Sequence, residues 1–477
     1  MKLAVVVQRY GQAINGGAEL HARYIAEHLA RHADVEVLTT CAADYVSWRN
    51  ELPVGLDRVN GVPVRRFRVK QERDPLLFAR WSQRVFDQPH SLADELDWLD
   101  AEGPASPTLV AHIEKHASAF DYLLFFSYRY YHAYHGARAA ASRAILVPTA
   151  ERDAAVGLSI FKPVFRGVRA LMYNSPEERA MIHAVSGNER VPSIVVGIGS
   201  DVPSNPQPAR FRSKFNIRGP FAVYVGRIDE NKGCKELFEF FDAYINAAGG
   251  QLSLVLVGNS LLPIPKHPRI RHLGFLDDPD KFDAMAAAEL LVMPSYFESL
   301  SMVALEAWAL GRPVLANAKC DVLKGQCIRS NAGLYYDGAA EFVETLRAIE
   351  QNRWLSASLG RNGRAFFREH YDWSVIERKY LDMLARLSKE TAVPHMDPVP
   401  GWFDRRKRDR APGTQVVAAL PIGPAFGQEA HIAAHPGVGA ASAEPPPEAR
   451  NRQSRVEQPG RYQRARPRGG SRRMSGA

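Results

Sequence analysis

The chain contains Glu298-Ser-Leu-Ser-Met-Val-Ala-Leu-Glu306, a segment that follows the apolar run Leu290-Leu-Val-Met293. The apolar run predicts a buried strand, and the segment after it predicts a helix opened by Ser299 or Ser301. A helix N-terminus at the carboxyl end of a parallel strand is a common phosphate-binding arrangement in α/β folds. We therefore expect an anionic ligand here, with one glutamate near each of its ends.

Two carboxylates are also typical of glycosidases, but the spacing of Glu298 and Glu306 argues against that chemistry. Eight helical residues rise by roughly 12 Å, whereas glycosidase carboxyl groups lie about 5–9.5 Å apart. Isolated glutamates at this spacing are most often solvated side chains. The interpretation therefore depends on a second motif.

That motif is the hydrophobic strand Phe221–Val225, followed by Gly226, Arg227 and, a few residues later, Lys232. An amphipathic helix is predicted to begin near Gly233. A glycine allows a ligand to approach the backbone closely, and two cations can hold a diphosphate leaving group. Their attraction for that group grows as the bond to it breaks, which is the differential binding that catalysis requires.

The order of these motifs resembles the carboxyl-terminal half of retaining GT-B glycosyltransferases of the large family-4 type. The resemblance implies that Arg227 and Lys232 bind the diphosphate of a nucleotide-sugar donor. It also implies that Glu298 lies by the donor sugar and that Glu306 bonds the ribose hydroxyls. The same resemblance gives further donor contacts to Gly226, Leu273, Ser299, Leu300 and Ser301.

The amino-terminal half begins with the predicted strand Lys2–Gln8, so no signal peptide is expected and a cytoplasmic location is predicted. Gly16 and Gly17 follow this strand and resemble the family's glycine pair, which approaches donor phosphates and acceptor. No G-x-G-x-x-G fingerprint of dinucleotide-binding proteins follows the strand. A plain tight turn is an equally good interpretation of two glycines alone.

Short apolar strands alternate with helical patterns throughout, which favours an α/β chain with two doubly wound parallel sheets. With 477 residues and 46% hydrophobic residues, the chain can bury two cores. The resemblance implies a GT-B fold, with Rossmann-like acceptor and donor domains facing each other across a cleft, and the composition adds a disordered basic tail. The predicted boundaries are 1–200 for the acceptor domain, 201–372 for the donor domain, 373–390 for a helix packing back on the first domain, and 391–477 for the tail.

A loop-rich insertion is expected within the first domain, from about 70 to 108. The four cysteines show no metal or disulfide spacing and are interpreted as reduced thiols. The tail carries 14 Lys and Arg against 7 Asp and Glu, so it holds most of the formal net charge of +9. Its composition favours a solvated segment over a lipid- or nucleic-acid-binding one, and no specific nucleic acid is expected.

Two segments depart from the family pattern. The donor-side loop is glycine-rich in the family, whereas the loop expected here, Asn317–Asn331, is not. Lys324 in this loop is a candidate residue for selecting the donor or the acceptor. Members of the family often have a histidine after the strand that here ends near Phe126. This chain has a Tyr-rich stretch there, in which His132 or His135 could take that place, or neither, and His132 is kept as the weaker site candidate. Glu151 and Asp153 follow another strand and are candidates for acceptor contacts or a general base.

Aromatic and basic residues alternate in 76–86 and 160–169, so either segment is a candidate for peripheral contact with a membrane carrying a lipid-linked acceptor. Packing against the core is the commoner cause of such a pattern.

The sequence thus predicts a retaining, metal-independent hexosyltransferase without a cofactor, using a nucleotide diphosphate sugar as co-substrate. The acceptor would be a saccharide or lipid-linked hydroxyl, and the product a cell-surface polysaccharide or glycolipid. A nucleotide-sugar epimerase of related fold and a non-catalytic nucleotide-sugar-binding protein remain the alternatives.

Overall fold

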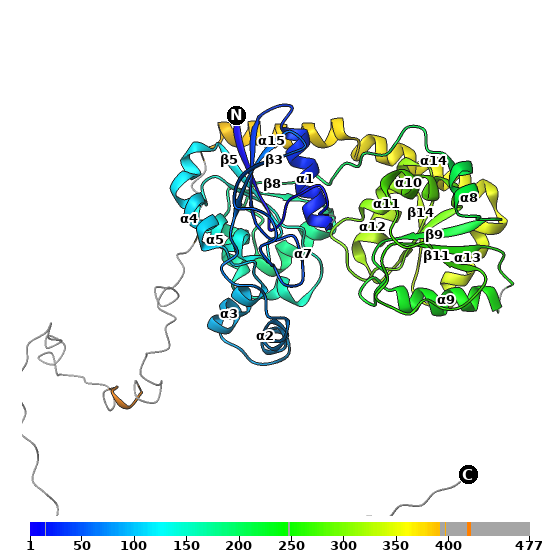
Figure 1. The fold of residues 1–477 in the computed structure, drawn as a ribbon, viewed down its shortest axis with the longest axis horizontal. Helices are drawn as coiled ribbons and strands as arrows, with labels where there is room; N and C mark the ends of the chain where they lie inside the picture. Colours follow the sequence, from blue (N-terminus) through cyan, green and yellow to red (C-terminus); the bar gives the residue numbers. More distant parts are fainter. Residues whose placement is uncertain (15, 247–248, 392–395, 397–416, 421–477) are drawn as a thin grey trace, which may run out of the picture. The chain divides into compact units, whose positions relative to one another are not determined.

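The computed structural model describes residues 1–14, 16–246, 249–391, 396 and 417–420. The chain divides into two units, Met1–Arg405 and Arg406–Ala477, and the helices and strands named below lie in the first (Figure 1). The predicted tail, 391–477, falls almost wholly outside the described residues.

The first half of this unit is built on a sheet that has eight strands within the described residues, in the order β3-β4-β2-β1-β5-β6-β7-β8. All neighbouring strands are parallel except the β3–β4 hairpin. The order reverses at β1, which lies between β2 and β5, and such a reversal opens a crevice at the carboxyl ends of the strands. The bounds are β1 Lys2–Val6, β2 Asp34–Thr40, β3 Gly55–Val59, β4 Val62–Phe67, β5 Tyr122–Phe126, β6 Ala144–Val147, β7 Ala170–Tyr173 and β8 Ser193–Val195.

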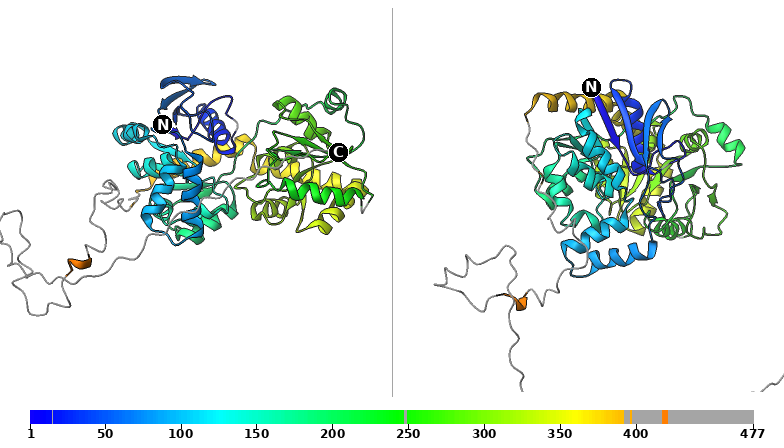
Figure 2. Two further views of the ribbon diagram at one scale, coloured as in Figure 1. Left: turned by 60° about the horizontal axis from the view of Figure 1, so that its bottom comes forward. Right: turned by 60° about the vertical axis from the view of Figure 1, so that its left-hand side comes forward.

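Helices connect these strands and cover the sheet, as Figures 1 and 2 show. The right-handed crossover connections of a parallel sheet require such helices. Their bounds are α1 Gly17–Leu29, α2 Pro75–Asp87, α3 Leu92–Glu102, α4 Pro107–His116, α5 Tyr131–Ala139, α6 Phe161–Gly167 and α7 Pro176–Ser186, with 3-10 turns η1 Ala117–Ala119 and η2 Ala154–Gly157.

The second half is built on a parallel sheet with six strands among the described residues, in the order β11-β10-β9-β12-β13-β14. The order reverses at β9, so the carboxyl ends of β9 and β12 are neighbours. The strands are β9 Phe221–Val225, β10 Ser253–Val257, β11 Ile270–His272, β12 Leu290–Met293, β13 Val314–Asn317 and β14 Gly333–Tyr336.

Eight helices among the described residues belong to this half or follow it. They are α8 Pro208–Lys214, α9 Cys234–Asn246, α10 Asp278–Ala287, α11 Met302–Ala309, α12 Asp321–Ser330, α13 Ala339–Gln351, α14 Arg353–His370 and α15 Trp373–Lys389.

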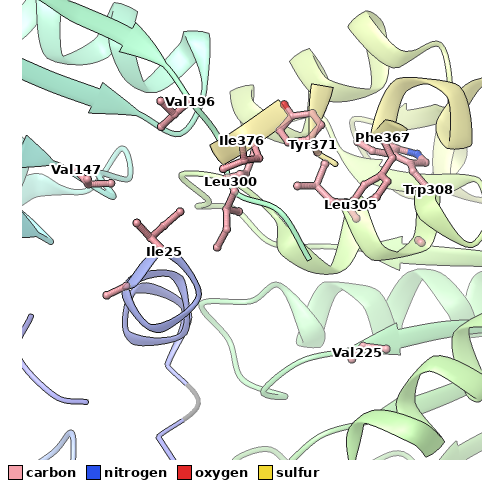
Figure 3. Close-up of a cluster of buried hydrophobic side chains, with 14 of the residues drawn as sticks. Ile25, Val147, Val196, Val225, Leu300, Leu305, Trp308, Phe367, Tyr371 and Ile376 are labelled. Carbon is pink, nitrogen blue, oxygen red and sulfur yellow. The ribbon is translucent and has the colours of Figure 1, made fainter. Parts of the chain in front are cut away.

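The core strands β1, β5, β6, β9 and β12 read as nearly continuous apolar runs because helices bury both faces of a parallel sheet. One buried cluster contains residues from both sheets and from the last helices. Figure 3 shows part of it, with Trp308, Phe367 and Tyr371 grouped together. This cluster fixes α11, the helix that carries Glu306, against the elements around it.

Helix α15 returns to the first sheet after the second sheet is complete. Glu377 receives a hydrogen bond from His28 of α1 at 2.6 Å, and Lys379 donates to the carbonyl of Val196 at 3.2 Å. Near its end, Leu387 accepts a hydrogen bond from Arg169 at 2.7 Å. The aromatic ring of Trp373 stacks on His28 with ring centroids 3.6 Å apart. The helix is therefore held along its whole length by residues of the first half.

The prediction of a loop-rich insertion at 70–108 is wrong, because most of this region forms the helices α2 and α3. Their capping residues explain why. Asp74 accepts from the first backbone amides of α2, and Ser91 with Asp94 forms a capping box on α3. Helix α2 is also clearly amphipathic, although it buries only Val85. The caps and this periodicity were the usable signals in the segment.

The segment Asn317–Asn331 was also expected to be a loop, and that expectation is wrong. It contains the end of β13 and the helix α12. Asn331 ends the helix in the left-handed conformation at φ +45°, a conformation that asparagine tolerates better than most residues. Lys324 therefore lies on a helix, where its ammonium group is 5.2 Å from the ring centre of Tyr335.

The two aromatic and basic segments differ in exposure. In 160–169, Phe161 and Phe165 are fully buried, so that segment packs against the core. In α2, Leu76 and Leu77 are exposed, and this helix keeps an apolar and basic outer face. None of the described helices has both the length and the apolar character of a membrane span. All four cysteines are buried and unpaired.

Candidate functional site

The loop between β9 and α9 brings the two predicted cations to the carboxyl edge of the second sheet. Arg227 is half exposed, and its guanidinium is ion-paired with Asp229. The same carboxylate accepts a hydrogen bond from the backbone amide of Lys232 at 2.8 Å. Asp229 is buried and therefore fixes both ends of the loop.

Gly233 joins this loop to α9 and has no room for a side chain. Its φ is +70°, and an added Cβ would lie 2.1 Å from the carbonyl oxygen of Pro294. This close approach places the β9–α9 loop directly against the turn that follows β12, which is where Glu298 lies.

We expect Gly233→Ala to lower the free energy of unfolding by more than the roughly 1–2 kcal/mol that the left-handed conformation alone costs. The new methyl group would also push Lys232 away from Glu298 and weaken the ion pair that joins the two loops. Gly219→Ala is the matched control, because Gly219 has φ +74° with open space around its Cβ position. Urea unfolding of both variants checks this, and equal losses would contradict the proposed steric role.

Lys232 and Glu298 form an ion pair across the two loops, with Nζ and Oε1 2.8 Å apart. Burial alone would lower the pKa of Lys232, but the charges of Glu298 and Glu151 outweigh burial and raise it. The ammonium group therefore stays charged near neutral pH. The two predicted catalytic residues from separate motifs thus meet at one point.

Helix α11 begins directly after this point. Ser301 is its N-cap and accepts a hydrogen bond from the amide of Ala304 at 3.2 Å. Ser299, two residues earlier, accepts a hydrogen bond at 3.3 Å from Asn174 of the first half, and Leu300 is buried. The positive end of the helix dipole consequently points to the Lys232–Glu298 pair, an environment that favours an anion.

Glu306, on α11, is buried. Its Oε1 accepts hydrogen bonds from Ser200 at 3.0 Å and from Lys281 at 3.3 Å. Its Oε2 has no hydrogen-bond partner among the described residues. Burial raises the pKa of Glu306 although Lys281 opposes the shift. A free carboxylate oxygen at this depth can accept hydrogen bonds from ligand hydroxyls.

The glycine pair and Leu273 are placed as follows. Gly16 is the N-cap of α1, and a Cβ there would collide with the carboxylate of Glu19, which is ion-paired with Arg9. Gly17 begins α1 and has open space around its Cβ position. Leu273 is half buried just after β11, at the carboxyl edge of the second sheet. Their roles as donor contacts stay predictions.

Backbone strain is concentrated at the carboxyl edge of the first sheet. Ser127 follows β5 at φ +64° and Thr149 follows β6 at φ +49°. A left-handed conformation costs a residue with a side chain about 1–3 kcal/mol, and it is a marked outlier for β-branched threonine. The two hydroxyl groups hydrogen-bond each other at 2.9 Å. Strain of this kind gathers at functional sites.

The three candidates of the first half have different environments. His132 is fully buried, its Nε2 lies 3.0 Å from the carbonyl of Phe126, and burial lowers its pKa to about 4. Asp153 is ion-paired with Arg129 at 2.6 Å. Glu151 is half buried, and burial raises its pKa to about 7, with Lys232 opposing the shift. The Nδ1 of His132 has no hydrogen-bond partner among the described residues, and the role of His132 stays a prediction.

A pocket lies between these two groups of loops. From the first half it is lined by Ala150, Arg152, Glu177, Glu178 and Met181. From the second half it is lined by Tyr296, Phe297, Glu298, Lys319, Cys320, Asp321 and Val322. Arg152 and Asp321 form an ion pair across it at 2.6 Å. The described residues include no cluster of three or more His, Cys, Asp or Glu suited to a metal ion.

Sequence reasoning missed several polar residues that hold these groups. Lys319 contacts Glu236 at 3.2 Å, and Tyr296 donates to the same carboxylate at 3.0 Å. Ser200 and Asn174 reach α11 and its N-terminal turn from more than 100 residues away. Single polar residues in loops carry no sequence signal of such long-range partners.

Comparison with known proteins bears on the second half most directly. Residues 219–352 match the family model described as glycosyl transferases group 1. A D-inositol 3-phosphate glycosyltransferase of Arthrobacter sp. is 31% identical over 106 residues, which cover 22% of this chain and 25% of that protein. The Streptomyces avermitilis protein of the same name is 39% identical over 93 residues, 19% of this chain and 20% of that protein. The matched segments thus span a quarter or less of these relatives.

Solved structures match over most of the described chain. Sucrose-phosphate synthase from Thermosynechococcus elongatus aligns with a TM-score of 0.59 and 18% identity, over 81% of this chain and 99% of that one. Anabaena Alr3699/HepE in complex with UDP-glucose aligns with a TM-score of 0.59 and 18% identity, over 81% of this chain and 100% of that one. At such identities the likeness establishes the fold. The chain has the GT-B fold, and the predicted fold class is confirmed.

Proposed function

We propose that this chain is a glycosyltransferase that moves a sugar from a nucleotide diphosphate sugar to a hydroxyl acceptor. The observation that carries the proposal is the Lys232–Glu298 pair at the N-terminus of α11, with Arg227 beside it. A bound diphosphate would meet two cations and a helix N-terminus, while Glu298 would face the sugar.

The donor would lie mainly on the second half, with the ribose hydroxyls at the free Oε2 of Glu306. The group 1 match of residues 219–352 supports this placement. Solved neighbours in complex with UDP and UDP-glucose make uracil the first donor base to test. We further propose that the transfer retains configuration, needs no metal ion and serves the synthesis of cell-surface glycans. The support for these three points is the family resemblance. The exposed apolar and basic face of α2 supports peripheral membrane contact with a lipid-linked acceptor.

A donor screen tests the proposal. First, the melting temperature of the protein is measured with UDP-, GDP- and ADP-sugars. Then the release of free nucleotide from the stabilising sugars is followed on the folded protein. We expect one nucleotide family to raise the melting temperature, because a ligand at 100 times its Kd stabilises by about 2.7 kcal/mol. Glu306→Ala should lose most of this shift, and Glu114→Gln, at an exposed site on α4, should keep it.

The other outcomes point to the alternatives. Stabilisation without nucleotide release, with acceptors present, would indicate a nucleotide-sugar-binding protein. A changed sugar that stays attached to its nucleotide would indicate an epimerase. If no nucleotide sugar shifted the melting temperature, the proposal would fail.

A further inference from the structure

The two oxygens of the Glu306 carboxylate have unequal surroundings. Oε1 accepts hydrogen bonds from Ser200 at 3.0 Å and from Lys281 at 3.3 Å, whereas Oε2 is buried and has no partner among the described residues. Leaving a buried polar atom unpaired costs free energy, so a partner for Oε2 is expected. In the proposed function a ligand hydroxyl is that partner. The groups that hold Oε1 then decide where Oε2 points.

Ser200 has a fixed place in the crossover segment between β8 and α8. Before it, a Cβ on Gly199 would lie 2.5 Å from the ring of Trp373, the first residue of α15. After it, the amide of Val202 donates to the carbonyl of Ser200 at 3.0 Å. Ser200 is itself buried. Its hydroxyl group therefore binds Glu306 from a segment that is tightly packed on both sides.

Lys281 is held by several contacts near the start of α10. Its Nζ lies 3.0 Å from Asp278, 3.3 Å from Glu306 and 4.1 Å from the ring centre of Phe282. Its backbone amide donates to the carbonyl of Asp277, the N-cap of the helix, at 2.8 Å. The side chain is only 18% exposed, so salt screens its charge less than that of a surface lysine. The ammonium group thus has a defined position beside Oε1.

The charge of Glu306 depends on this lysine. Burial raises the pKa of Glu306, and the charge of Lys281 and the hydrogen bond from Ser200 act against that rise. Burial alone would lower the pKa of Lys281, but the charges of Glu306 and Asp278 outweigh burial and raise it. An ionised carboxylate accepts stronger hydrogen bonds from hydroxyl groups than a neutral carboxyl group does. Without the lysine, the buried carboxylate would take up a proton more readily or turn toward another partner.

We propose that Lys281 and Ser200 are positioning residues for the nucleotide-sugar donor, because they hold Oε1 of Glu306 and so direct Oε2 to the ribose hydroxyls; this inference rests on the proposed function. The two residues act through Glu306 and come from separate elements, α10 and the crossover segment. A ribonucleotide therefore meets a hydrogen-bond acceptor that is already in place, which lowers the cost of ordering this side chain on binding.

The test compares the affinity of the protein for UDP with its affinity for 2′,3′-dideoxy-UDP, by isothermal titration calorimetry. If the donor screen selects GDP- or ADP-sugars, the corresponding GDP or ADP pair is used. The two nucleotides share the base and the diphosphate, so a general change in the protein alters both affinities alike. We expect the wild type to bind UDP about 10- to 100-fold more tightly, the range for hydrogen bonds to a charged group.

Lys281→Met keeps the apolar stem of the side chain and removes its charge. We expect it to reduce the preference for UDP to about threefold or less, with the affinity for the dideoxy nucleotide within about a factor of two of the wild type. Lys281→Arg should restore part of the preference, because it returns a cation of different shape. Lys115→Met, the same substitution at an exposed position on α4, is the control and should match the wild type.

The other outcomes separate this inference from the proposed function. A wild-type preference for UDP in Lys281→Met would overturn the inference and leave the proposed function standing. If Lys281→Met does not fold, Ser200→Ala decides, because it removes the other bond to Oε1 without changing any charge. An unchanged preference in Ser200→Ala would then overturn the inference, as would equal binding of both nucleotides by the wild type. A wild type that binds no nucleoside diphosphate would overturn the proposed function as well.

Discussion

Lys232→Ala is expected to lower kcat by about 100- to 1,000-fold while changing the KM for the donor much less. The side chain supplies a half-buried cation 2.8 Å from Glu298, and the surrounding carboxylates keep it charged. Removing a single preorganised group that stabilises developing charge typically costs this much. The charge on the diphosphate is largest as it departs, so the loss should fall on the transition state.

The control for this variant lies three residues further along the chain. Lys235→Ala removes the same charge from an exposed position on α9, and its kinetics should match those of the wild type. Lys232→Arg should recover part of the activity, because it restores the charge with a different shape. An increase in donor KM at unchanged kcat would show that Lys232 contributes only to ground-state binding.

Trp308→Ala is expected to lower the free energy of unfolding by about 3–5 kcal/mol, the usual cost of truncating a large core side chain. Trp308 is fully buried, and its indole N–H donates to the carbonyl of Ala332 at 2.9 Å. Its ring packs edge-on against Phe366, and a Cβ on Gly363 would lie 2.5 Å from it. The substitution leaves a cavity and removes one of the two hydrogen bonds that the Ala332 carbonyl accepts, the other coming from the amide of Val314 at 3.3 Å.

Guanidinium unfolding of Trp308→Ala beside Trp354→Ala measures this effect. Trp354 is 74% exposed on α14, so its replacement should cost less than about 0.5 kcal/mol. Similar losses in the two variants would mean that the packing around α11 contributes little stability. Since α11 carries Glu306 and begins beside Glu298, weakened donor binding should accompany the loss of stability in Trp308→Ala.

The sequence was a good guide to the second sheet because its strands are short apolar runs separated by turn residues. It also placed Lys232 and Glu298 at one site, although they are 66 residues apart. The reason is topological. Both residues follow strands whose carboxyl ends are neighbours at the point where strand order reverses, so an α/β interpretation already brings them together.

Helices α3 and α12 were harder to predict because their amphipathic patterns are weak, and α2 was harder because it buries only Val85. The conformation of the loop that carries Glu151 was harder still. It depends on contacts of Asp153 with Arg129 and of Ala150 with Glu178, 24 and 28 residues away. Sequence spacing shows that acidic residues follow a strand, but it does not show which of them is already engaged and which is free.

The return of α15 to the first sheet limits how such a protein can be recombined. A hybrid gene that joined the first half of this chain to the second half of another would also replace the 17 residues of α15. The foreign helix would then have to match His28, Arg169 and Val196 of the original half. Exchange of donor specificity by gene shuffling would therefore need two crossover points, one before β9 and one before Trp373.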